Sequence, residues 1–198
     1  MPKSTFFNLS EEKKKRIFDA AVQEFSIRRF SEASINQIVK NAGIPRGSFY
    51  QYFADKEDIY LYMVEEVSKD IHEILGNREA FNPNASFFET IIQTAKETLK
   101  VGNIRPEYSK IGMLTVLDNS EFIIQLMKAS AEKYIEMIER DKQCGLIKPE
   151  IDSVLVVKMI HTFVLNEYFS CGFDKTLYLK KVEDAIQIFK QGIAVHQD

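Results

Sequence analysis

Helical periodicity along the chain constrains the fold more than any other property of the sequence. Apolar residues recur every three or four positions in most windows, and the strict alternation typical of a half-buried strand is scarce. Glycines and prolines lie at intervals of roughly one helix length, where they suit the end of one helix or the start of the next. We therefore predict an all-α fold of about nine helices, three short ones followed by longer ones.

The predicted helix boundaries rest on cap residues and breaks. Ser10 followed by two glutamates suits a helix start, because a hydroxyl caps free N–H groups and acids favour the positive helix end. Asp55, Asp152 and Asp174 are placed to cap later helices, and Gly102-Asn103 is expected to break one. The predicted helices are 10 to about 28, 34–42, 45–52, 56–75, 84–101, 106–117, 120–143, 152–172 and 175–195.

Charge is distributed unevenly along the chain. The net charge of the whole sequence is −3, which does not suit a protein that binds nucleic acid over its entire surface. Residues 1–55 carry nine Lys and Arg and six Asp and Glu, a net charge of +3, so residues 56–198 carry −6. A basic end on an acidic body suits a protein that touches a polyanion at one end.

The composition also bears on compartment and on the class of ligand. Cys144 and Cys171 are too few for a disulfide framework, and we expect both thiols to be reduced. No stretch approaches the roughly 20 apolar residues that cross a membrane, and the first residues lack the apolar core of a signal peptide. We therefore expect a cytoplasmic protein with no membrane partner. The 15 Phe and 8 Tyr suit a dense core or a pocket for an apolar ligand.

The segment from Ser34 to Lys56 has the layout of a helix-turn-helix. A short predicted helix ends at Gly43, which suits a left-handed C-terminal cap. Only Ile44 separates this glycine from Pro45, which suits the first turn of the second short helix because proline has no N–H to lose there. In such a unit the second helix enters the major groove of DNA, while the first crosses the phosphate backbone.

Polar residues of this segment are the predicted contacts with double-stranded DNA. Ser34 and Gln37 suit phosphate contacts at the start of the first helix. Arg46 can reach guanine edges or phosphate from the second helix, and Gly47 lets the backbone approach DNA closely. Packing is an equal alternative for Tyr52, whereas Phe49 and Phe53 are expected in the core. The full predicted set is Ser34, Gln37, Arg46, Gly47, Ser48, Tyr50, Gln51, Tyr52 and Lys56.

The first 60 residues resemble the DNA-binding part of the TetR family of regulators. The resemblance is carried by the run AGIPRGSFYQYFADKEDI (42–59), by SINQIV (34–39) and by IFDAAVQEF (17–25). Pro45 and Val39 depart from the commonest family form, in which hydroxyl and alanine side chains are frequent. The resemblance implies a helix-turn-helix domain in residues 1–55 and a helical effector-binding and dimerisation domain in residues 56–198, with 56–76 as the connecting helix.

The resemblance further implies a homodimer that reads a palindromic operator. The last two long helices of such proteins usually pair with their copies, and two-fold symmetry matches two half-sites about one DNA turn apart. Intramolecular packing would use the same apolar residues, so the sequence alone does not divide core from interface. The predicted dimerisation residues are Val156, Met159, Ile160, Phe163, Val182, Ile186, Phe189 and Ile193.

The resemblance also implies a small-molecule effector, which we expect to be apolar or aromatic. Methionine and aromatic side chains suit adaptable apolar sites, although plain core is an alternative for each of them. The predicted lining residues are Phe88, Tyr108, Met113, Leu117, Phe122, Met127, Tyr134, His161 and Tyr168. We predict a repressor that the effector releases from its operator, and no cofactor or metal.

Three other readings stay open at this point. A DNA-binding regulator without a small-molecule effector would have a closed C-terminal core. An enzyme on a helical scaffold is the remote alternative, since the three histidines show no metal-binding spacing and the sequence has no phosphate loop or nucleophile elbow. An activator would use the same DNA chemistry as a repressor.

Overall fold

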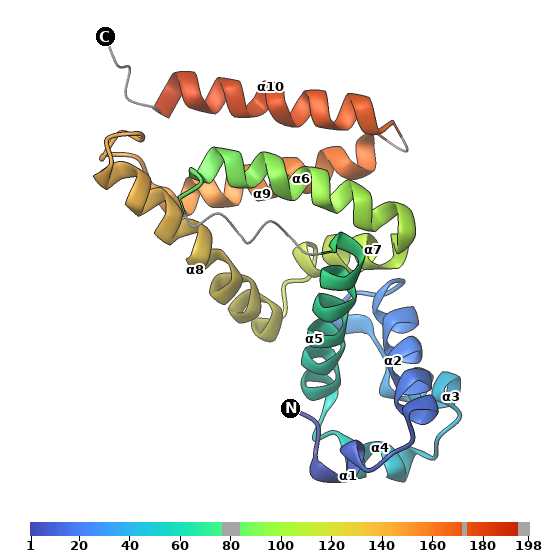
Figure 1. Ribbon diagram of the computed structural model, residues 1–198. Helices are drawn as coiled ribbons and strands as arrows, with labels where there is room; N and C mark the ends of the chain where they lie inside the picture. The colour runs from blue at the N-terminus through green and yellow to red at the C-terminus, as the bar shows by residue number, and fades with distance from the viewer. Residues whose placement is uncertain (77–83, 172–173, 194–198) are drawn as a thin grey trace. The chain divides into compact units, whose positions relative to one another are not determined.

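The computed structural model describes residues 1–76, 84–171 and 174–193 (Figure 1). Within these residues the chain forms α-helices and one 3-10 helix and no β-strand, so the predicted all-α fold is confirmed. The helices are α1 (Ser4–Phe7), α2 (Glu11–Phe25), η1 (Phe30–Glu32), α3 (Ile35–Ala42), α4 (Arg46–Tyr52), α5 (Lys56–Leu75), α6 (Phe87–Ile104), α7 (Pro106–Val116), α8 (Glu121–Gln143), α9 (Ser153–Ser170) and α10 (Lys175–Ile193).

The predicted cap residues are confirmed. Ser10 accepts the N–H of Lys13 at 3.4 Å at the start of α2. The carboxylate of Asp55 accepts an N–H of α5 at 2.8 Å, and those of Asp152 and Asp174 accept N–H groups of α9 and α10 at 3.0 and 2.9 Å. Each carboxylate satisfies an N–H that has no partner within its helix.

Two helix predictions were wrong. The expected break at Gly102-Asn103 does not occur, because α6 continues to Ile104. The stop lies instead at Pro106, since proline disfavours helical geometry in the residue before it, and Arg105 has φ −134° and ψ 71°. The sequence reading also missed α1, whose Phe6 is buried.

The described residues fall into two compact units. The first unit comprises residues 1–76 and 101–124, and the second comprises 84–100, 125–171 and 174–193. Helices α1–α5 and α7 belong to the first unit, whereas α6 and α8 each contribute residues to both. The predicted boundary after residue 55 stays a prediction.

Aromatic packing holds the first unit together. Phe49 and Phe53 of the helix-turn-helix segment are fully buried, as predicted. Phe6 of α1 packs against both Phe53 and Tyr62, with ring centroids 5.1 and 4.8 Å apart. In Figure 1, α2 and α5 lie side by side, with α3 beside the lower part of α2 and α4 below. The N-terminal segment is therefore part of the core that supports α4.

The core of the second unit is mainly aliphatic. It joins side chains of α6, α8, α9 and α10, including Phe87, Ile138 and Ile160. Asp141 of α8 is buried and accepts the N–H of Phe87 at 2.7 Å, which caps α6 from a distant part of the chain. Among the described helices, none is both long and apolar enough to span a membrane.

Candidate DNA-binding surface

The helix-turn-helix has the predicted layout, except that Pro45 precedes the second helix instead of forming its first turn. Gly43 ends α3 with φ 63°, the left-handed conformation that glycine adopts at little cost. The N–H of Ile44 returns to the carbonyl of Val39 at 3.0 Å. Pro45 has extended geometry and forms the N-cap of α4, one residue before the helix itself begins. Buried Ile38 and Phe49 belong to the core beneath the two helices.

The exposed face of α4 presents most of the predicted DNA contacts. Arg46, Gly47, Tyr50 and Gln51 are exposed, and Ser48 is half-buried. The guanidinium of Arg46 donates to the side-chain oxygen of Asn36 on α3 and lies 3.4 Å from the Tyr50 hydroxyl. A cation, an amide and a phenol therefore lie on one short helix, which suits contacts with base edges and phosphates.

Ser34 and Gln37 mark the start of α3. Ser34 is its N-cap, but its hydroxyl makes no capping bond and so can meet a phosphate. The backbone N–H of Ser34 is held instead by the carboxylate of Glu24, which is fully buried and 2.9 Å away. Gln37 donates to Asn41 at 2.8 Å, so its amide is oriented along the helix. Glu24 is a positioning residue that the sequence reading did not identify.

Tyr52 and Lys56 differ from the other predicted contacts. Tyr52 is only 6% exposed, and Lys13 donates to its hydroxyl at 3.1 Å. The ammonium of Lys56 donates to the carbonyl oxygens of Ser31 and Ala33 at 3.3 and 3.1 Å. Burial lowers the pKa of Lys56. Both side chains therefore have intramolecular partners that a phosphate contact would have to share or replace.

The N-terminal segment caps the last turn of α4, which the sequence reading missed. The backbone N–H and the ammonium of Lys3 donate to the carbonyls of Tyr52 and Tyr50, each at 2.8 Å. The hydroxyl of Thr5 donates to the carbonyl of Gln51. These donors satisfy carbonyls that a helix end leaves without partners, and a lysine there suits the helix dipole. Phe6 and Phe7 were the available signal, because large apolar side chains are usually buried in the core.

The predicted dimerisation residues divide between core and surface. Val156, Ile160, Val182 and Ile186 are at most 5% exposed and belong to the core of their own chain. Met159 is 49% exposed. Phe163 and Phe189 are half-buried, and the side chain of Ile193 lies outside the described residues.

Four predicted effector-lining residues lie in the first unit. Tyr108 is buried and its hydroxyl donates to Asp70 at 2.5 Å, while burial and this carboxylate raise the pKa of Tyr108. Phe122 packs on Phe30, with ring centroids 4.6 Å apart. Met113, on α7, is half-buried, and Leu117, just after α7, is exposed.

The remaining five predicted effector-lining residues lie in the second unit, and three of them belong to two aromatic pairs. Tyr134 and His161 meet edge to face with centroids 4.6 Å apart, and burial lowers the pKa of His161. Tyr168 meets Tyr178 at 5.7 Å, and the Tyr178 hydroxyl is buried without a hydrogen-bond partner in the described structure. Burial raises the pKa of Tyr178. Phe88 is buried in the same core, and Met127 is half-buried on α8.

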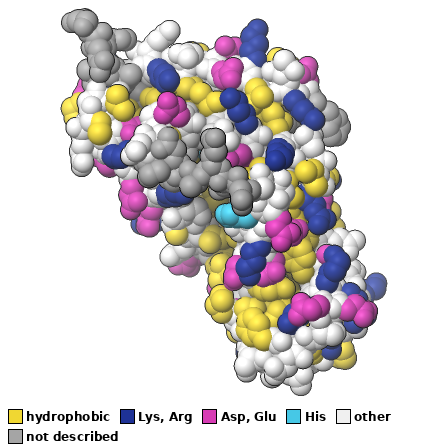
Figure 2. Space-filling model, viewed as in Figure 1, with side chains coloured by type: hydrophobic (Ala, Val, Ile, Leu, Met, Phe, Trp, Pro, Cys, Tyr) yellow, Lys and Arg dark blue, Asp and Glu magenta, His cyan; other side chains and the backbone are white. Residues whose placement is uncertain are grey.

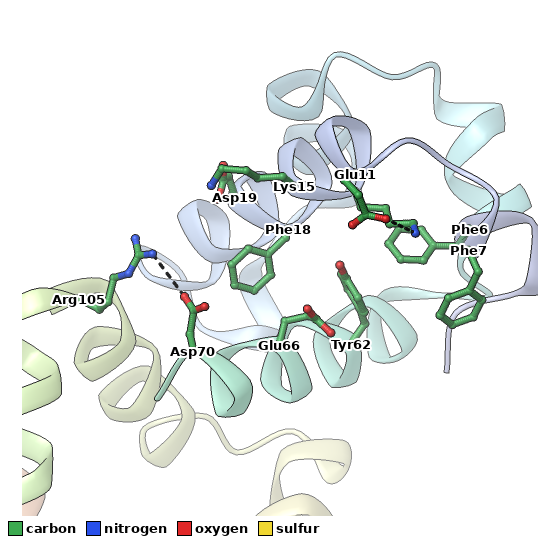
Figure 3. Close-up of a pocket in the computed structure, with 11 residues that line it drawn as sticks. Phe6, Phe7, Glu11, Lys15, Phe18, Asp19, Tyr62, Glu66, Asp70 and Arg105 are labelled. Carbon is green, nitrogen blue, oxygen red and sulfur yellow. Dashed lines mark hydrogen bonds and ion pairs between the residues drawn. The ribbon is translucent and has the colours of Figure 1, made fainter. Parts of the chain in front are cut away.

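A hollow of about 380 Å³ lies within the first unit, and none of the predicted effector residues lines it (Figure 3). Rings from the N-terminal segment, α2 and α5 line it together with charged groups that are already paired. Lys14 with Glu11 and Arg105 with Asp70 are two of these pairs, at 2.9 and 3.4 Å. Because these charges are engaged with one another, the hollow is poorly suited to an ionic ligand.

Neither the surface charge nor the metal-ligating side chains indicate a second functional site in the described residues. On the face shown in Figure 2, acidic, basic and apolar side chains are interspersed. The part of the chain that the structure describes holds no cluster of three His, Cys, Asp or Glu side chains that suits a metal ion. The outer face of α3 and α4 is therefore the surface whose side chains best suit a particular ligand, namely DNA.

Known proteins with similar sequences and structures are transcription regulators. Residues 17–63 match the family model for bacterial regulatory proteins of the tetR family. The uncharacterized HTH-type transcriptional regulator YdgC of Bacillus subtilis is 27% identical over 75% of both chains. A TetR family transcriptional regulator from Chloroflexus aurantiacus has a similar structure, with a TM-score of 0.69, 25% identity and coverage of 99% of this chain and 100% of that one. FadR from Bacillus subtilis, solved in complex with stearoyl-CoA, has a TM-score of 0.64, 20% identity and coverage of 87% and 97%.

Proposed function

The chain belongs to the TetR family of DNA-binding transcriptional regulators, and from this premise we propose that it is a repressor released from a palindromic operator by a small apolar molecule. The outer face of α4 is the observation that carries the proposal. Arg46, Tyr50 and Gln51 are exposed there, next to the open backbone of Gly47. We assign DNA contacts to residues 1–55, and dimerisation and effector binding to residues 56–198.

We place the homodimer interface on the outer faces of α9 and α10. Leu155 and Met159 of α9 are 52% and 49% exposed, and Ile188 of α10 is 71% exposed. Four of the residues first predicted for this role are buried in their own core, so the exposed apolar side chains support the interface instead. Pairing these faces with a second copy would remove apolar surface from water.

We place the effector beside the aromatic pairs of the second unit. The buried Tyr178 hydroxyl has no partner in the described structure, and an unsatisfied buried polar group costs about 1–3 kcal/mol. A polar group on an otherwise apolar effector would satisfy it. His161 and Tyr134 add a ring nitrogen and a phenol to the same unit. FadR, which shares the fold, was solved with stearoyl-CoA, a ligand with a long apolar chain.

Selection of bound duplexes from a random-sequence DNA library tests the DNA-binding part of the proposal. We expect an enriched palindrome with half-sites about one helical turn, roughly 34 Å, apart. Weak binding that shows no sequence preference and disappears in moderate salt would point to phosphate contacts alone and contradict the proposal.

The selected duplex then serves as the probe for an effector. Stearoyl-CoA is the first compound to test, with coenzyme A as the matched control that lacks the acyl chain. Release of the duplex by stearoyl-CoA and not by coenzyme A would support an apolar effector. Unchanged DNA affinity across acyl-CoA thioesters, free fatty acids and aromatic compounds would favour a regulator without a small-molecule effector. A reporter gene behind the selected sequence distinguishes repression from activation.

A further inference from the structure

Asp118 joins the segment between α7 and α8 to the entrance of the helix-turn-helix. It lies just after α7 and is only 4% exposed. One carboxylate oxygen accepts the backbone N–H of Ser31 at 2.7 Å, across 87 residues of sequence. The other accepts the N–H of Ser120 at 2.8 Å, just before α8. One side chain therefore connects the start of α8 to the loop between α2 and α3, which contains the short helix η1.

The rest of that loop is held from two other sides. Glu24 of α2 accepts the N–H of Ser34, and Lys56 of α5 donates to the carbonyl of Ala33. Both of these partners lie on helices outside the loop. Three charged side chains, those of Glu24, Lys56 and Asp118, therefore hold the backbone of this loop. Of these, only Asp118 comes from the 101–124 segment of the first unit.

Aromatic contacts strengthen the same connection. Phe122 in the first turn of α8 packs on Phe30 of the loop and on Tyr60 of α5, with centroids 4.6 and 5.8 Å apart. The hydroxyls of Tyr60 and Thr115 are 2.7 Å apart, which ties α5 to α7. Moving the start of α8 would therefore disturb both a charge-assisted hydrogen bond and an aromatic contact with the loop.

The loop leads directly into the DNA-binding helices. Ser34 ends it as the N-cap of α3, and Gly43 then connects α3 to α4. Packed helices move as bodies because their interiors are close-packed. A displacement of the Ser31 backbone is expected to shift the start of α3, and with it the exposed face of α4.

We propose that Asp118 is a positioning residue for DNA binding, which fixes the loop before α3 and couples the helix-turn-helix to α8. Helix α8 begins three residues later and continues into the second unit, where Tyr134 contacts His161. The positioning role rests on the DNA binding proposed above, and the coupling to an effector rests in addition on the effector proposed there. Asp118 acts through the backbone of Ser31, at the entrance to the predicted DNA-binding helices.

The test compares Asp118→Asn with Glu121→Gln in the full-length protein. The amide introduced by D118N would keep one acceptor oxygen, so one of the two N–H groups loses its partner. Glu121 is exposed and close in sequence, so E121Q removes the same charge without breaking a described contact. Binding to the selected duplex and to a scrambled duplex is measured well below the melting temperature, together with amide hydrogen exchange at Ser31.

For D118N we expect roughly tenfold weaker binding to the selected duplex, as for the loss of one charge-assisted hydrogen bond. Binding to the scrambled duplex should stay unchanged, exchange at Ser31 should rise, and E121Q should behave as wild type. A folded D118N with the wild-type ratio of specific to non-specific affinity would overturn the proposal, even if its melting temperature fell.

A second variant keeps the test decisive if D118N does not fold. Phe122→Leu retains an apolar side chain but shortens the contact with Phe30, and we expect about threefold weaker binding to the selected duplex on the scale of one aromatic contact. An unchanged affinity ratio in F122L would then overturn the proposal. None of these measurements needs an effector, so failure to find one leaves the outcome for Asp118 intact.

Discussion

The guanidinium of Arg46 donates a hydrogen bond to the side-chain oxygen of Asn36, which links the first turn of α4 to α3. The guanidinium carbon also lies 6.0 Å from the centre of the Tyr50 ring. Arg46 remains exposed, so these contacts orient a cation that faces solvent. A side chain held in place before binding loses less conformational entropy when it pairs with a base edge or a phosphate.

Replacing Arg46 tests whether this oriented cation reads DNA. We expect Arg46→Ala to weaken binding to the selected duplex by about 1–3 kcal/mol and to relax sequence preference at one position of each half-site. Asn36→Ala leaves the guanidinium but removes its tether, so its effect should be smaller. Competition binding against single-base variants of the duplex measures both effects. A uniform loss over all sequences in R46A would indicate a phosphate contact instead of base recognition.

The free energy of unfolding at low pH should depend on the protonation of Asp118. Burial raises the pKa of this carboxyl, but hydrogen bonds from Ser120 and Ser31 outweigh burial and lower the pKa to about 2. A carboxyl whose pKa is depressed on folding stabilises the folded state at neutral pH. This contribution is lost as the pH falls from near 4 through about 2. We expect the free energy of unfolding to drop by about 2 kcal/mol from this group over that window.

Chemical denaturation at a series of pH values measures this contribution. The curve of D118N should be flatter than that of wild type below pH 4, and the two should run parallel above it. Glu121→Gln serves again as the control for removal of one acidic side chain. Curves for D118N and wild type that stay parallel down to pH 2 would contradict the assigned pKa.

Sequence reasoning succeeded where structure is decided locally. Caps such as Asp55 act within one helical turn, and the glycine turn at Gly43 follows from the conformation of a single residue. The same reasoning missed Asp118, because its bond to Ser31 joins residues that periodicity and cap rules do not relate. It also missed the cap that Thr5 provides to α4, across 46 residues.

The N-terminal segment should matter for DNA affinity although it lies outside the recognition helix. Lys3 and Thr5 donate to carbonyls in the last turn of α4. Because α4 has only seven residues, external caps contribute much of its order. We expect the double variant Lys3→Met with Thr5→Val to bind the selected duplex several-fold more weakly, for a loss of about 1 kcal/mol.

The conservative variant Thr5→Ser is the matched control for that experiment. It keeps the hydroxyl and should bind the duplex as wild type does. Circular dichroism checks that both variants are folded, since Phe6 still anchors the segment in the core. Wild-type affinity in the double variant would show that the carbonyls of α4 are satisfied equally well by water.

The division between core and interface in α9 and α10 could not be predicted from periodicity. Apolar residues occupy more than one face of α9, and spacing alone does not say which face meets its own chain. The structure buries Val156 and Ile160 and leaves Leu155 and Met159 exposed. The candidate interface therefore keeps Met159, loses Val156 and Ile160 and gains Leu155, which turns it toward a different side of α9.

Charge placed on that exposed face should break the homodimer. We expect Met159→Lys and Ile188→Lys to shift the protein from dimer to monomer in sedimentation experiments at micromolar concentration, because an interface core tolerates unpaired charge poorly. Ile27→Lys is the matched control, since Ile27 is 61% exposed in the first unit. Monomers should lose affinity for the palindrome but keep it for a half-site. Persistent dimers in both variants would place the interface elsewhere.

Gly47 offers a test that separates DNA contact from folding. A Cβ added at this position meets no atom within 4 Å, and its φ is not in the left-handed region. Alanine favours helix over glycine by up to about 1 kcal/mol, so Gly47→Ala should leave stability equal or higher. If the backbone of α4 approaches DNA closely here, the added methyl group should lower affinity for the selected duplex by roughly tenfold, the scale of one lost contact.

Gly112→Ala in α7 is the matched control, because its Cβ also meets open space. G112A should gain stability without losing DNA affinity, and a G47A protein that binds as wild type would remove Gly47 from the DNA-binding surface.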